Sequence, residues 1–202
     1  MVGKSEKRKG IEILIKAFGN EFKNGATDVC LYMRSSLTPA QKKTLKKYPQ
    51  VRFGILPSVS DSDLVAGYQA ADVFVLTKHG EGWGRPVMEA MAGGTPVIVP
   101  YWSGMTEFVD PDSPLTIKID SLEQAFQGQP WFIGGKENAK KHQWAKISES
   151  QVREKLRWAT DNRDQLGELG EKDRRRMMAS YTRDNIARDA VERLQTIWNS
   201  LK

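Results

Sequence analysis

Hydrophobic residues along this chain occur either at helical spacing or in short unbroken runs, and the two kinds of segment alternate. Over 11–22 the apolar residues recur three and four positions apart, which predicts an amphipathic helix. The apolar run over 28–33 predicts a strand, and Thr38 opens a predicted helix that ends at Leu45. A second strand is predicted over 51–56. The chain therefore begins as alternating helices and strands.

The same alternation continues as far as residue 99. The predicted elements there are a helix from Ser60 or Asp61 to Ala71, a strand over 73–77, a glycine-rich turn over 80–84, a helix over 86–92 and a strand over 96–99. Strands separated by helices are typical of a parallel sheet with helices on both faces. The predicted fold class is therefore α/β, with a Rossmann-like, doubly wound parallel sheet.

Beyond Asp110 the regular pattern fades into a polar stretch that contains several prolines and glycines, which predicts loops with short elements. Ser148, with Gln151 three residues later, forms a capping-box pattern and predicts a helix over 149–159. We expect the large aromatic residues between these two regions to anchor the loops to the body of the protein; they are Trp131, Phe132 and Trp144.

The last helix is predicted over 183–201, with Thr182 as its cap. Its apolar residues, from Ile186 to Leu201, fall on one face, which makes the helix amphipathic. Such a helix needs a groove or a partner to cover its apolar face. A length of 202 residues fits one domain over 1–202 that ends in this helix.

The start of the chain departs from the doubly wound pattern. Only Met1 and Val2 are apolar before a turn at Gly3 and Lys4, where such a domain is expected to begin with a full strand. Two interpretations stay open: the first strand is abbreviated, or the chain is cut from a longer one.

Charge narrows the classes of partner. The chain has 31 Lys and Arg against 25 Asp and Glu, a net charge of +6, and a positive excess attracts phosphate, nucleic acid or an anionic membrane. Its basic clusters are interrupted by acidic and polar residues, without the interleaved aromatic residues on which bases stack. A basic nucleic-acid-binding domain is therefore the weakest function class, and we expect no nucleic-acid partner.

Cysteine and histidine are scarce. Cys30 is the single cysteine and lies in an apolar run that predicts a buried strand, so a disulfide framework or a cysteine metal cluster is excluded. His79 and His142 have no zinc-site spacing, and we expect no metal, no cofactor and no role for His79. The N-terminus has no apolar signal core, and no run approaches the about 18 apolar residues of a membrane span. We therefore expect a soluble, cytoplasmic protein without evident membrane association.

The stretch over 79–97 carries the most informative chemistry. Two carboxylates, Glu81 and Glu89, are separated by seven residues, one in the glycine-rich turn and one about a helical turn inside the next helix. Ionised carboxylates accept hydrogen bonds from neighbouring sugar hydroxyls, and the free amides at a helix N-terminus favour a diphosphate. The turn and the helix together predict a cradle for a nucleotide sugar.

This stretch resembles the signature of glycosyltransferase family 4, a group of retaining transferases with the GT-B architecture. Further matches to the family are the opening Gly3–Lys4 and Arg8–Gly10, the segment Asp72–Val75 and the segment Thr106–Val109. The resemblance extends over nearly the whole chain and is to the family's C-terminal, donor-binding domain, one of two Rossmann-like halves. It implies that the donor is a nucleotide-diphosphate sugar.

The resemblance also implies roles for individual residues. Glu89 would bind the ribose and Glu81 the donor sugar near the reacting carbon, while Lys4 and Lys9 would neutralise the leaving diphosphate. Lys4 departs from the family's arginine and would lose bidentate phosphate contact. The residues expected to contact the donor through the glycine turn and, for the nucleobase, through backbone groups are Gly82, Trp83, Gly84, Gly54, Ile55 and Leu56.

Several alternatives remain open at this point. Glu81 and Glu89 could instead form salt bridges with Lys78 or Arg85, and Trp83 could pack on its own helix instead of stacking on a sugar. Because 202 residues cannot hold two GT-B halves, the resemblance implies an acceptor-binding N-terminal domain or subunit elsewhere, without which this domain would be inactive. Two other hypotheses for the function are a non-catalytic nucleotide-sugar-binding module and an epimerase of the same architecture.

Overall fold

The computed structural model describes residues 7–24, 28–49, 52–55, 60–125 and 136–201. The first elements are η1 (Lys7–Lys9), α1 (Ile11–Phe22), β1 (Cys30–Met33), α2 (Pro39–Leu45), β2 (Arg52–Ile55), α3 (Asp61–Gln69), β3 (Phe74–Val75), α4 (Arg85–Ala92) and β4 (Val97–Pro100). They are followed by η2 (Ser103–Glu107), β5 (Thr116–Ile117), β6 (Leu122–Gln124), α5 (Lys136–Lys141), β7 (Gln143–Ala145), α6 (Glu149–Asp161), α7 (Arg163–Ser180) and α8 (Arg183–Ser200).

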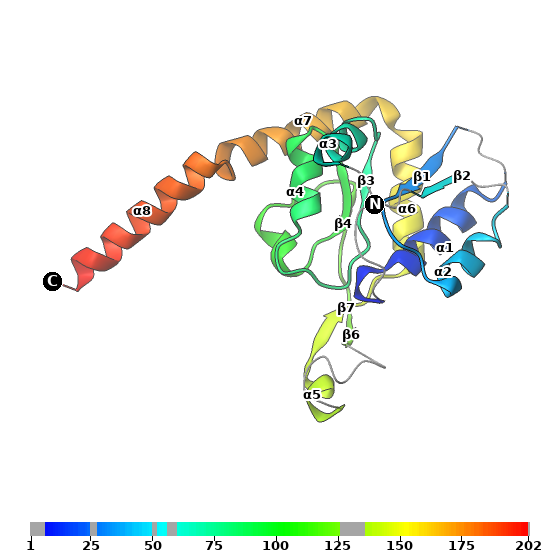
Figure 1. Cartoon of the computed structure of the whole chain (residues 1–202), viewed down its shortest axis with the longest axis horizontal. Coiled ribbons are helices and arrows are strands. Elements are labelled where there is room, and N and C mark those ends of the chain that lie inside the picture. The colour runs from blue at the N-terminus through cyan, green and yellow to red at the C-terminus, as the bar shows by residue number, and fades with distance from the viewer. Residues whose placement is uncertain (1–6, 25–27, 50–51, 56–59, 126–135, 202) are drawn as a thin grey trace.

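The strands form a middle layer between two groups of helices (Figure 1). The helices α1, α2 and α6 pack together on one side, and α3, α4 and α7 on the other. Strand β1 pairs with β2 in parallel, and β3, β4 and β5 form a second parallel sheet in that order. The predicted α/β class with parallel sheets is confirmed. An antiparallel ribbon of β6 and β7 projects from this body.

Three predicted helix starts have the expected local chemistry. Thr38, Ser60 and Ser148 each accept a hydrogen bond from a backbone amide three residues on, while that residue's side chain binds the cap's own amide. These reciprocal capping boxes satisfy donors that a helix cannot satisfy internally, and each cap is worth about 1 kcal/mol. The starts of α2, α3 and α6 are therefore properties of the local sequence.

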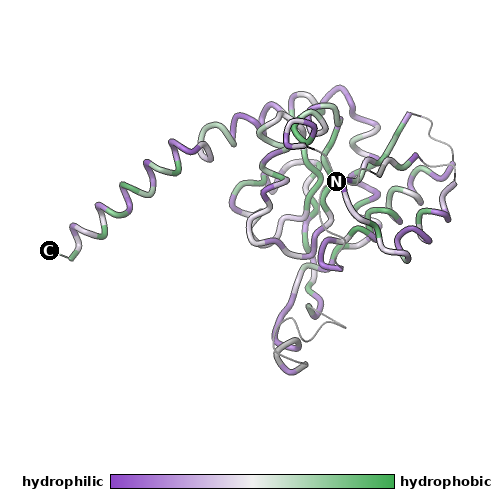
Figure 2. Tube along the Cα trace, viewed as in Figure 1, coloured by the Kyte–Doolittle hydropathy of each residue, from purple (hydrophilic) through white to green (hydrophobic). Residues whose placement is uncertain are grey.

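The core is apolar and lies between the layers, as the hydrophobic middle of the tube in Figure 2 shows. Helix α1 contributes Leu14 and Ile15, which are fully buried, and packs along α6. Arg153 and Arg157 of α6 bind the two carboxylate oxygens of Glu21, at 2.9 and 2.7 Å, and so clamp these helices together.

The prediction that Cys30 lies in a wholly buried strand is wrong, because Cys30 is exposed. Residues alternate along β1, so that Leu31 and Met33 are buried while Cys30 and Tyr32 are exposed. The apolar composition of the run conceals this alternation because Cys and Tyr are compatible with either face. Strand β3 and helix α3 are also shorter than predicted, and β4 is displaced by one residue.

Of the last two helices, α7 was not predicted and α8 was. Helix α7 lacks a strong apolar period and buries only Leu166, Gly170 and Met177. Helix α8 begins at Thr182's cap as expected, but none of its residues is buried, and it extends away from the body with its apolar stripe uncovered (Figures 1 and 2).

The predicted anchors have different outcomes. Trp144 is buried, as expected, and its ring stacks on His79 with centroids 5.1 Å apart. Trp131 and Phe132 lie outside the described residues, and so does the start of the chain through Lys4.

Candidate functional site

The start of α1 is fixed against the end of β3. Gly10 has φ +66°, and a Cβ there would lie 1.8 Å from the carbonyl oxygen of Thr77, so only glycine allows this approach. The Thr77 hydroxyl donates to the Gly10 carbonyl at 2.9 Å, and the His79 amide donates to the Arg8 carbonyl at 2.9 Å. These contacts bring the basic residues of η1 to the glycine-rich turn.

Glu81 lies at the centre of a group of cations. Its Oε2 accepts hydrogen bonds from Nζ of Lys9, at 3.0 Å, and from Nζ of Lys78, while Arg8 Nη1 lies 3.8 Å away. Arg8 also donates to the Gly80 carbonyl at 2.8 Å. Three cations around one carboxylate leave a net positive charge, which suits an anionic ligand.

Burial and charge act against each other in this cluster. Burial pushes the pKa of Glu81 upward, but the hydrogen bonds from Lys78 and Lys9 outweigh it and hold the pKa below its usual value. The Lys78 side chain is only 3% exposed, and its burial lowers the pKa to about 8 although Glu81 opposes the shift. Lys78 therefore carries a charge that is lost in mildly alkaline solution.

Hydrogen bonds from residues of η2 hold the turn that carries Glu81. The Glu81 carbonyl accepts from the Ser103 hydroxyl at 2.7 Å and from the Gly104 amide at 3.2 Å. Ser103 has φ +58°, an uncommon backbone conformation for a non-glycine residue. Gly84, at φ +91°, is the N-cap of α4, so the turn places Glu81 near the N-terminal end of this helix.

Glu89, inside α4, is held by side chains of α3 and of α4 itself. The buried Tyr68 hydroxyl of α3 donates to Glu89 Oε2 at 3.0 Å, and Arg85 lies 3.7 Å from Oε1. Burial, with the negative charge of Glu89 next to it, raises the pKa of Tyr68, so the phenol stays a donor at neutral pH. The carboxylate is thus oriented while remaining partly exposed.

The other predicted donor residues are distributed differently. Trp83 packs on the body, with its ring 5.8 Å from Phe108 and 6.2 Å from Tyr181, although it stays 41% exposed. Gly54 lies in β2 against the Tyr32 ring, which approaches to within 2.4 Å of where a Cβ would be. Ile55 ends β2, and Leu56 and Lys4 lie outside the described residues.

Sequence reasoning missed two contributors to the site. Lys78 entered it only as a surface salt-bridge partner of Glu81, whereas it is buried. Tyr68 was covered only by the predicted helix that ends at Ala71, and no local signal showed that its hydroxyl reaches a residue 21 positions away. The salt bridges considered as the alternative for the glutamates do form, to Lys78 and to Arg85, and they are compatible with a binding site.

The side chains of His79 and Glu107 take no part in the cluster around Glu81. His79 is buried, and its Nδ1 lies 2.7 Å from the Ala145 carbonyl, which ties the turn to β7. Glu107 is exposed at the end of η2. Across the described ranges, no cluster of three or more His, Cys, Asp or Glu side chains suits a metal ion.

A profile of the family described as "Glycosyl transferases group 1" matches residues 1–126. Among related sequences, an uncharacterized glycosyltransferase of Sulfolobus islandicus rod-shaped virus 1 is 28% identical over 132 residues, covering 63% of this chain and 39% of that protein. A D-inositol 3-phosphate glycosyltransferase of Corynebacterium diphtheriae is 25% identical over 169 residues, covering 73% of this chain and 39% of that protein. The chain thus spans well under half of these relatives.

Solved structures share the fold. The C-terminal domain of a group 1 glycosyl transferase from Francisella tularensis has a TM-score of 0.66 at 19% identity, covering 90% of this chain and 85% of that one. Sucrose-phosphate synthase from Thermosynechococcus elongatus has a TM-score of 0.70 at 18% identity, covering 98% of this chain and 46% of that one. Within the described residues, no helix is long and apolar enough to cross a membrane. The architecture is that of a GT-B C-terminal domain, and the chain belongs to the group 1 glycosyl transferases.

Proposed function

We propose that this chain is the donor-binding domain of a retaining glycosyltransferase that takes a nucleotide-diphosphate sugar without a metal ion. The observation that carries the proposal is the cluster at the start of α4, where Lys9 and Lys78 share the carboxylate of Glu81. When a glycosidic bond breaks, negative charge grows on the departing diphosphate, and fixed cations stabilise it. We assign that role to Lys9, with Lys4 as a second cation.

The two glutamates have separate tasks in this proposal. Glu89, oriented by Tyr68, accepts hydrogen bonds from the ribose, and Glu81 accepts from hydroxyls of the donor sugar. Backbone groups of Gly82, Trp83 and Gly84 lie next to the sugar and phosphates, and those of Gly54, Ile55 and Leu56 next to the nucleobase. The acceptor is bound by a further domain or subunit, and the proposed compartment is the cytoplasm, where a lone thiol such as Cys30 stays reduced.

The test is calorimetric titration of the full chain with a panel of nucleoside diphosphates and their sugars, with chelator present. We expect binding without metal, and Glu89→Ala should weaken nucleoside diphosphate binding by about 1–3 kcal/mol. Binding that disappears with chelator and returns with magnesium would reject the metal-free site. Unchanged affinity of a folded Glu89→Ala variant would remove Glu89 from it.

Glu81 needs a gentler substitution because alanine would leave the buried Lys78 without its carboxylate partner. Glu81→Gln keeps the shape and removes the charge. This variant should bind the nucleotide sugar more weakly but bind the nucleoside diphosphate with unchanged affinity, since Glu81 is assigned to the sugar. Equal weakening of both ligands would contradict this division.

A further inference from the structure

Aromatic side chains connect the glycine-rich turn to the junction of α7 and α8. Tyr181 is the C-cap of α7, and Thr182 next to it is the N-cap of α8. The centroid of the Tyr181 ring lies 6.2 Å from that of Trp83, which belongs to the turn, and 6.2 Å from that of Phe108. The ring centroids of Trp83 and Phe108 are 5.8 Å apart. Three rings from segments distant in the chain therefore meet beside the turn.

Tyr181 makes two kinds of contact there. Its ring meets both neighbouring rings edge-on, at interplanar angles of 66° and 73°, which is a favoured arrangement of aromatic rings. Its hydroxyl donates to the backbone carbonyl of Glu107, the last residue of η2, at 2.8 Å. One side chain therefore holds Trp83 of the turn and the backbone of η2 at the same time.

The turn and η2 are in direct contact. A Cβ at Gly104 of η2 would lie 2.1 Å from the carbonyl oxygen of Gly82. The amide of Gly104 and the hydroxyl of Ser103 both donate to the Glu81 carbonyl. Because closely packed segments transmit a displacement to each other, the position of η2 sets the position of the turn.

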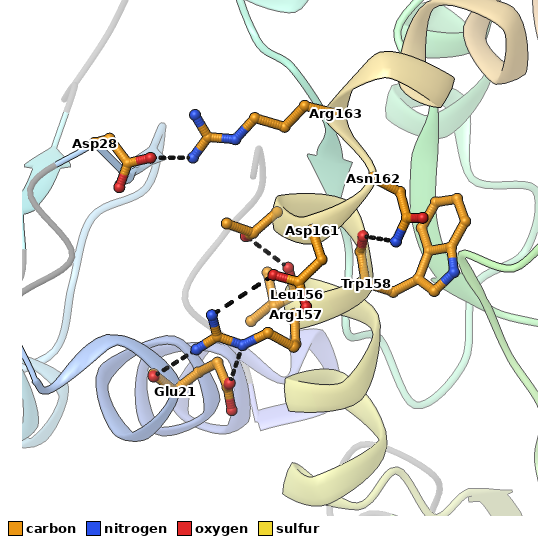
Figure 3. Close-up of polar contacts among 9 residues, drawn as sticks. Glu21, Asp28, Leu156, Arg157, Trp158, Asp161, Asn162 and Arg163 are labelled. Carbon is orange, nitrogen blue, oxygen red and sulfur yellow. Dashed lines mark hydrogen bonds and ion pairs between the residues drawn. The ribbon is translucent and has the colours of Figure 1, made fainter.

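Helix α7, which ends at Tyr181, is fixed to the body of the protein. Near its start Arg163 binds Asp28, ahead of β1, at 2.5 Å (Figure 3). In its middle a Cβ at Gly170 would lie 2.0 Å from the carbonyl oxygen of Gly94, so α7 lies directly against the residues that follow α4. Tyr181 is therefore at the end of a helix that is held in place.

The last part of α7 also holds the segment after η2. Arg176 donates to the Phe108 carbonyl at 3.2 Å and lies 3.2 Å from Oδ2 of Asp110. Lys172 lies 2.8 Å from the same oxygen. Phe108 and the end of η2 are therefore fixed relative to α7, on the same side as the Tyr181 contact.

Helix α8 continues from this junction, and the junction sets its direction. Asn185, in its first turn, donates from its side-chain amide to the carbonyls of Met178 and Ala179, at 3.2 and 2.9 Å. These bonds join α8 to the last turn of α7, while no residue of α8 is buried. A change in the direction of α8 therefore acts first on Tyr181.

We propose that Tyr181 is a positioning residue of the donor site, which holds the turn in place and links it to the direction of α8. Tyr181 acts through Trp83 and η2 on the backbone groups of Gly82 to Gly84. A turn that is already ordered presents these groups at a smaller entropic cost of binding. That they contact the donor rests on the proposed function, whereas the contact between Tyr181 and the turn does not.

The first test measures hydrogen exchange of the full chain without ligand at two amides. The Gly104 amide donates to the Glu81 carbonyl and reports on the turn, while the Phe74 amide donates to Pro96 in the sheet and reports on global unfolding. Tyr181→Leu should accelerate exchange at Gly104 about tenfold more than at Phe74. Equal acceleration at the two amides, or none at Gly104, would overturn the proposal.

Tyr48 offers a matched control. Like Tyr181 it is half-buried, but its ring packs against Gly19 of α1, on the other side of the strand layer. Tyr48→Leu should leave the ratio of the exchange rates at Gly104 and Phe74 at its parent value. A ratio raised equally by both variants would mean that loss of any tyrosine loosens the turn, and the proposal would be wrong.

A second pair of variants tests the link to α8. Asn185→Ala removes the bonds to the last turn of α7 and should raise the same ratio about threefold. Asn199→Ala, near the far end of α8, should leave it unchanged. In a Tyr181→Leu background Asn185→Ala should have no further effect, because the link passes through Tyr181. An unchanged ratio in Asn185→Ala, or additive effects in the double variant, would overturn the link.

The third test uses calorimetry with UDP-glucose, GDP-glucose, ADP-glucose and the matching nucleoside monophosphates. The Tyr181→Leu variant should bind the nucleotide sugar roughly tenfold more weakly, because the turn is assigned to the sugar and phosphates. Its affinity for the monophosphate, which lacks the sugar and the second phosphate, should change less than about twofold. Tyr181→Phe, which keeps the ring, should stay within about threefold of the parent.

The outcomes separate this proposal from the proposed function. Equal weakening of the nucleotide sugar and the monophosphate would show a general loss of folding and would overturn a positioning role for Tyr181. If the parent chain binds no nucleotide sugar, the proposed function fails, while the exchange ratio still decides whether Tyr181 positions the turn.

Discussion

At the scale of single residues, the orientation of Glu89 depends on a hydroxyl from another helix. Tyr68 is 4% exposed and touches the ring of Phe74, so its position is set by the core while its hydroxyl reaches the carboxylate. This makes Tyr68 a positioning residue for the proposed ribose contact, with no direct contact to the ligand.

Tyr68→Phe removes the hydroxyl and keeps the ring. We expect nucleoside diphosphate binding to weaken by about 1 kcal/mol, roughly fivefold, because Glu89 loses one fixed orientation. The effect should disappear in a Glu89→Ala background, and the parent's preference for ribose over 2′,3′-dideoxyribose should diminish. Calorimetry on the four variants of this cycle checks the coupling. Additive losses would mean that Tyr68 acts independently of Glu89.

Lys78 gives the site a pH dependence. Burial lowers its pKa to about 8, and the charged groups that contact it or its partner are Glu81, Lys9 and Arg8. Below pH 8 Lys78 is protonated and adds to the positive potential at the turn, and above it this charge is lost. Affinity for a nucleoside diphosphate should therefore fall as pH rises from 7 to 9, by on the order of tenfold.

Lys78→Met should give weaker binding that changes little over this range. The exposed pair of Lys140 and Glu137 offers a control, because Lys140→Met removes one positive charge outside the cluster and should keep the parent profile. Calorimetric titrations with nucleoside diphosphate at several pH values test this prediction, and melting curves confirm that each variant is folded. A parent affinity that stays constant to pH 9 would contradict a role for the Lys78 charge.

Residue-level reasoning from the sequence proposed Glu81 and Glu89 from their spacing around a glycine turn, which is local information, and Lys9 from the family resemblance. It could not identify Lys78 as a buried group or Tyr68 as a partner. Both roles arise from packing between elements distant in the chain, as when α3 meets α4. The prediction that Cys30 is buried failed for a related reason, since the elements that cover β1 decide which of its faces is buried.

At the scale of elements, α7 and α8 show what periodicity can and cannot predict. Helix α8 was predicted because its apolar residues repeat on one face, and its cap at Thr182 forms as expected. Helix α7 was missed because half of its residues are charged and it buries only three residues. Strong local periodicity predicts that a helix exists, but it does not say whether the helix is covered.

The two helices should contribute unequally to stability. Deleting residues 183–202 removes no buried side chain of α8, so we expect the free energy of unfolding to change by less than about 0.5 kcal/mol. Met177→Ala in α7 should cost about 2–5 kcal/mol, because Met177 is 3% exposed in the core. Urea unfolding of both variants tests this. A large loss on deletion would show that α8 packs on the body in solution.

At the scale of the whole molecule, the alternation of helices and strands was enough to predict an α/β fold and its parallel sheets. The division of the parallel strands into two sheets was not predictable, because it depends on the tertiary spacing between β1 and β3. The early departure from the pattern, at Met1 and Val2, falls outside the described residues.

The last prediction concerns activity of the chain by itself. Transfer requires donor and acceptor to be held in near-attack positions, and such positioning accounts for about 7–11 kcal/mol of barrier lowering. The described residues present one recognisable cluster, at the start of α4, and it is assigned to the donor. The chain also spans only 39% of two relatives that are named glycosyltransferases.

We therefore expect the purified 202-residue chain to bind a donor but to transfer no sugar at an enzymatic rate. The measurement incubates the chain with nucleotide sugars and a panel of acceptors, with and without an added N-terminal GT-B domain, and follows the release of nucleoside diphosphate. Activity that appears only with the added domain supports a donor-binding half. Donor binding with no transfer under any combination favours a non-catalytic module instead. Robust transfer by the chain alone would mean that an acceptor site lies within these residues, because the donor cluster cannot position two substrates.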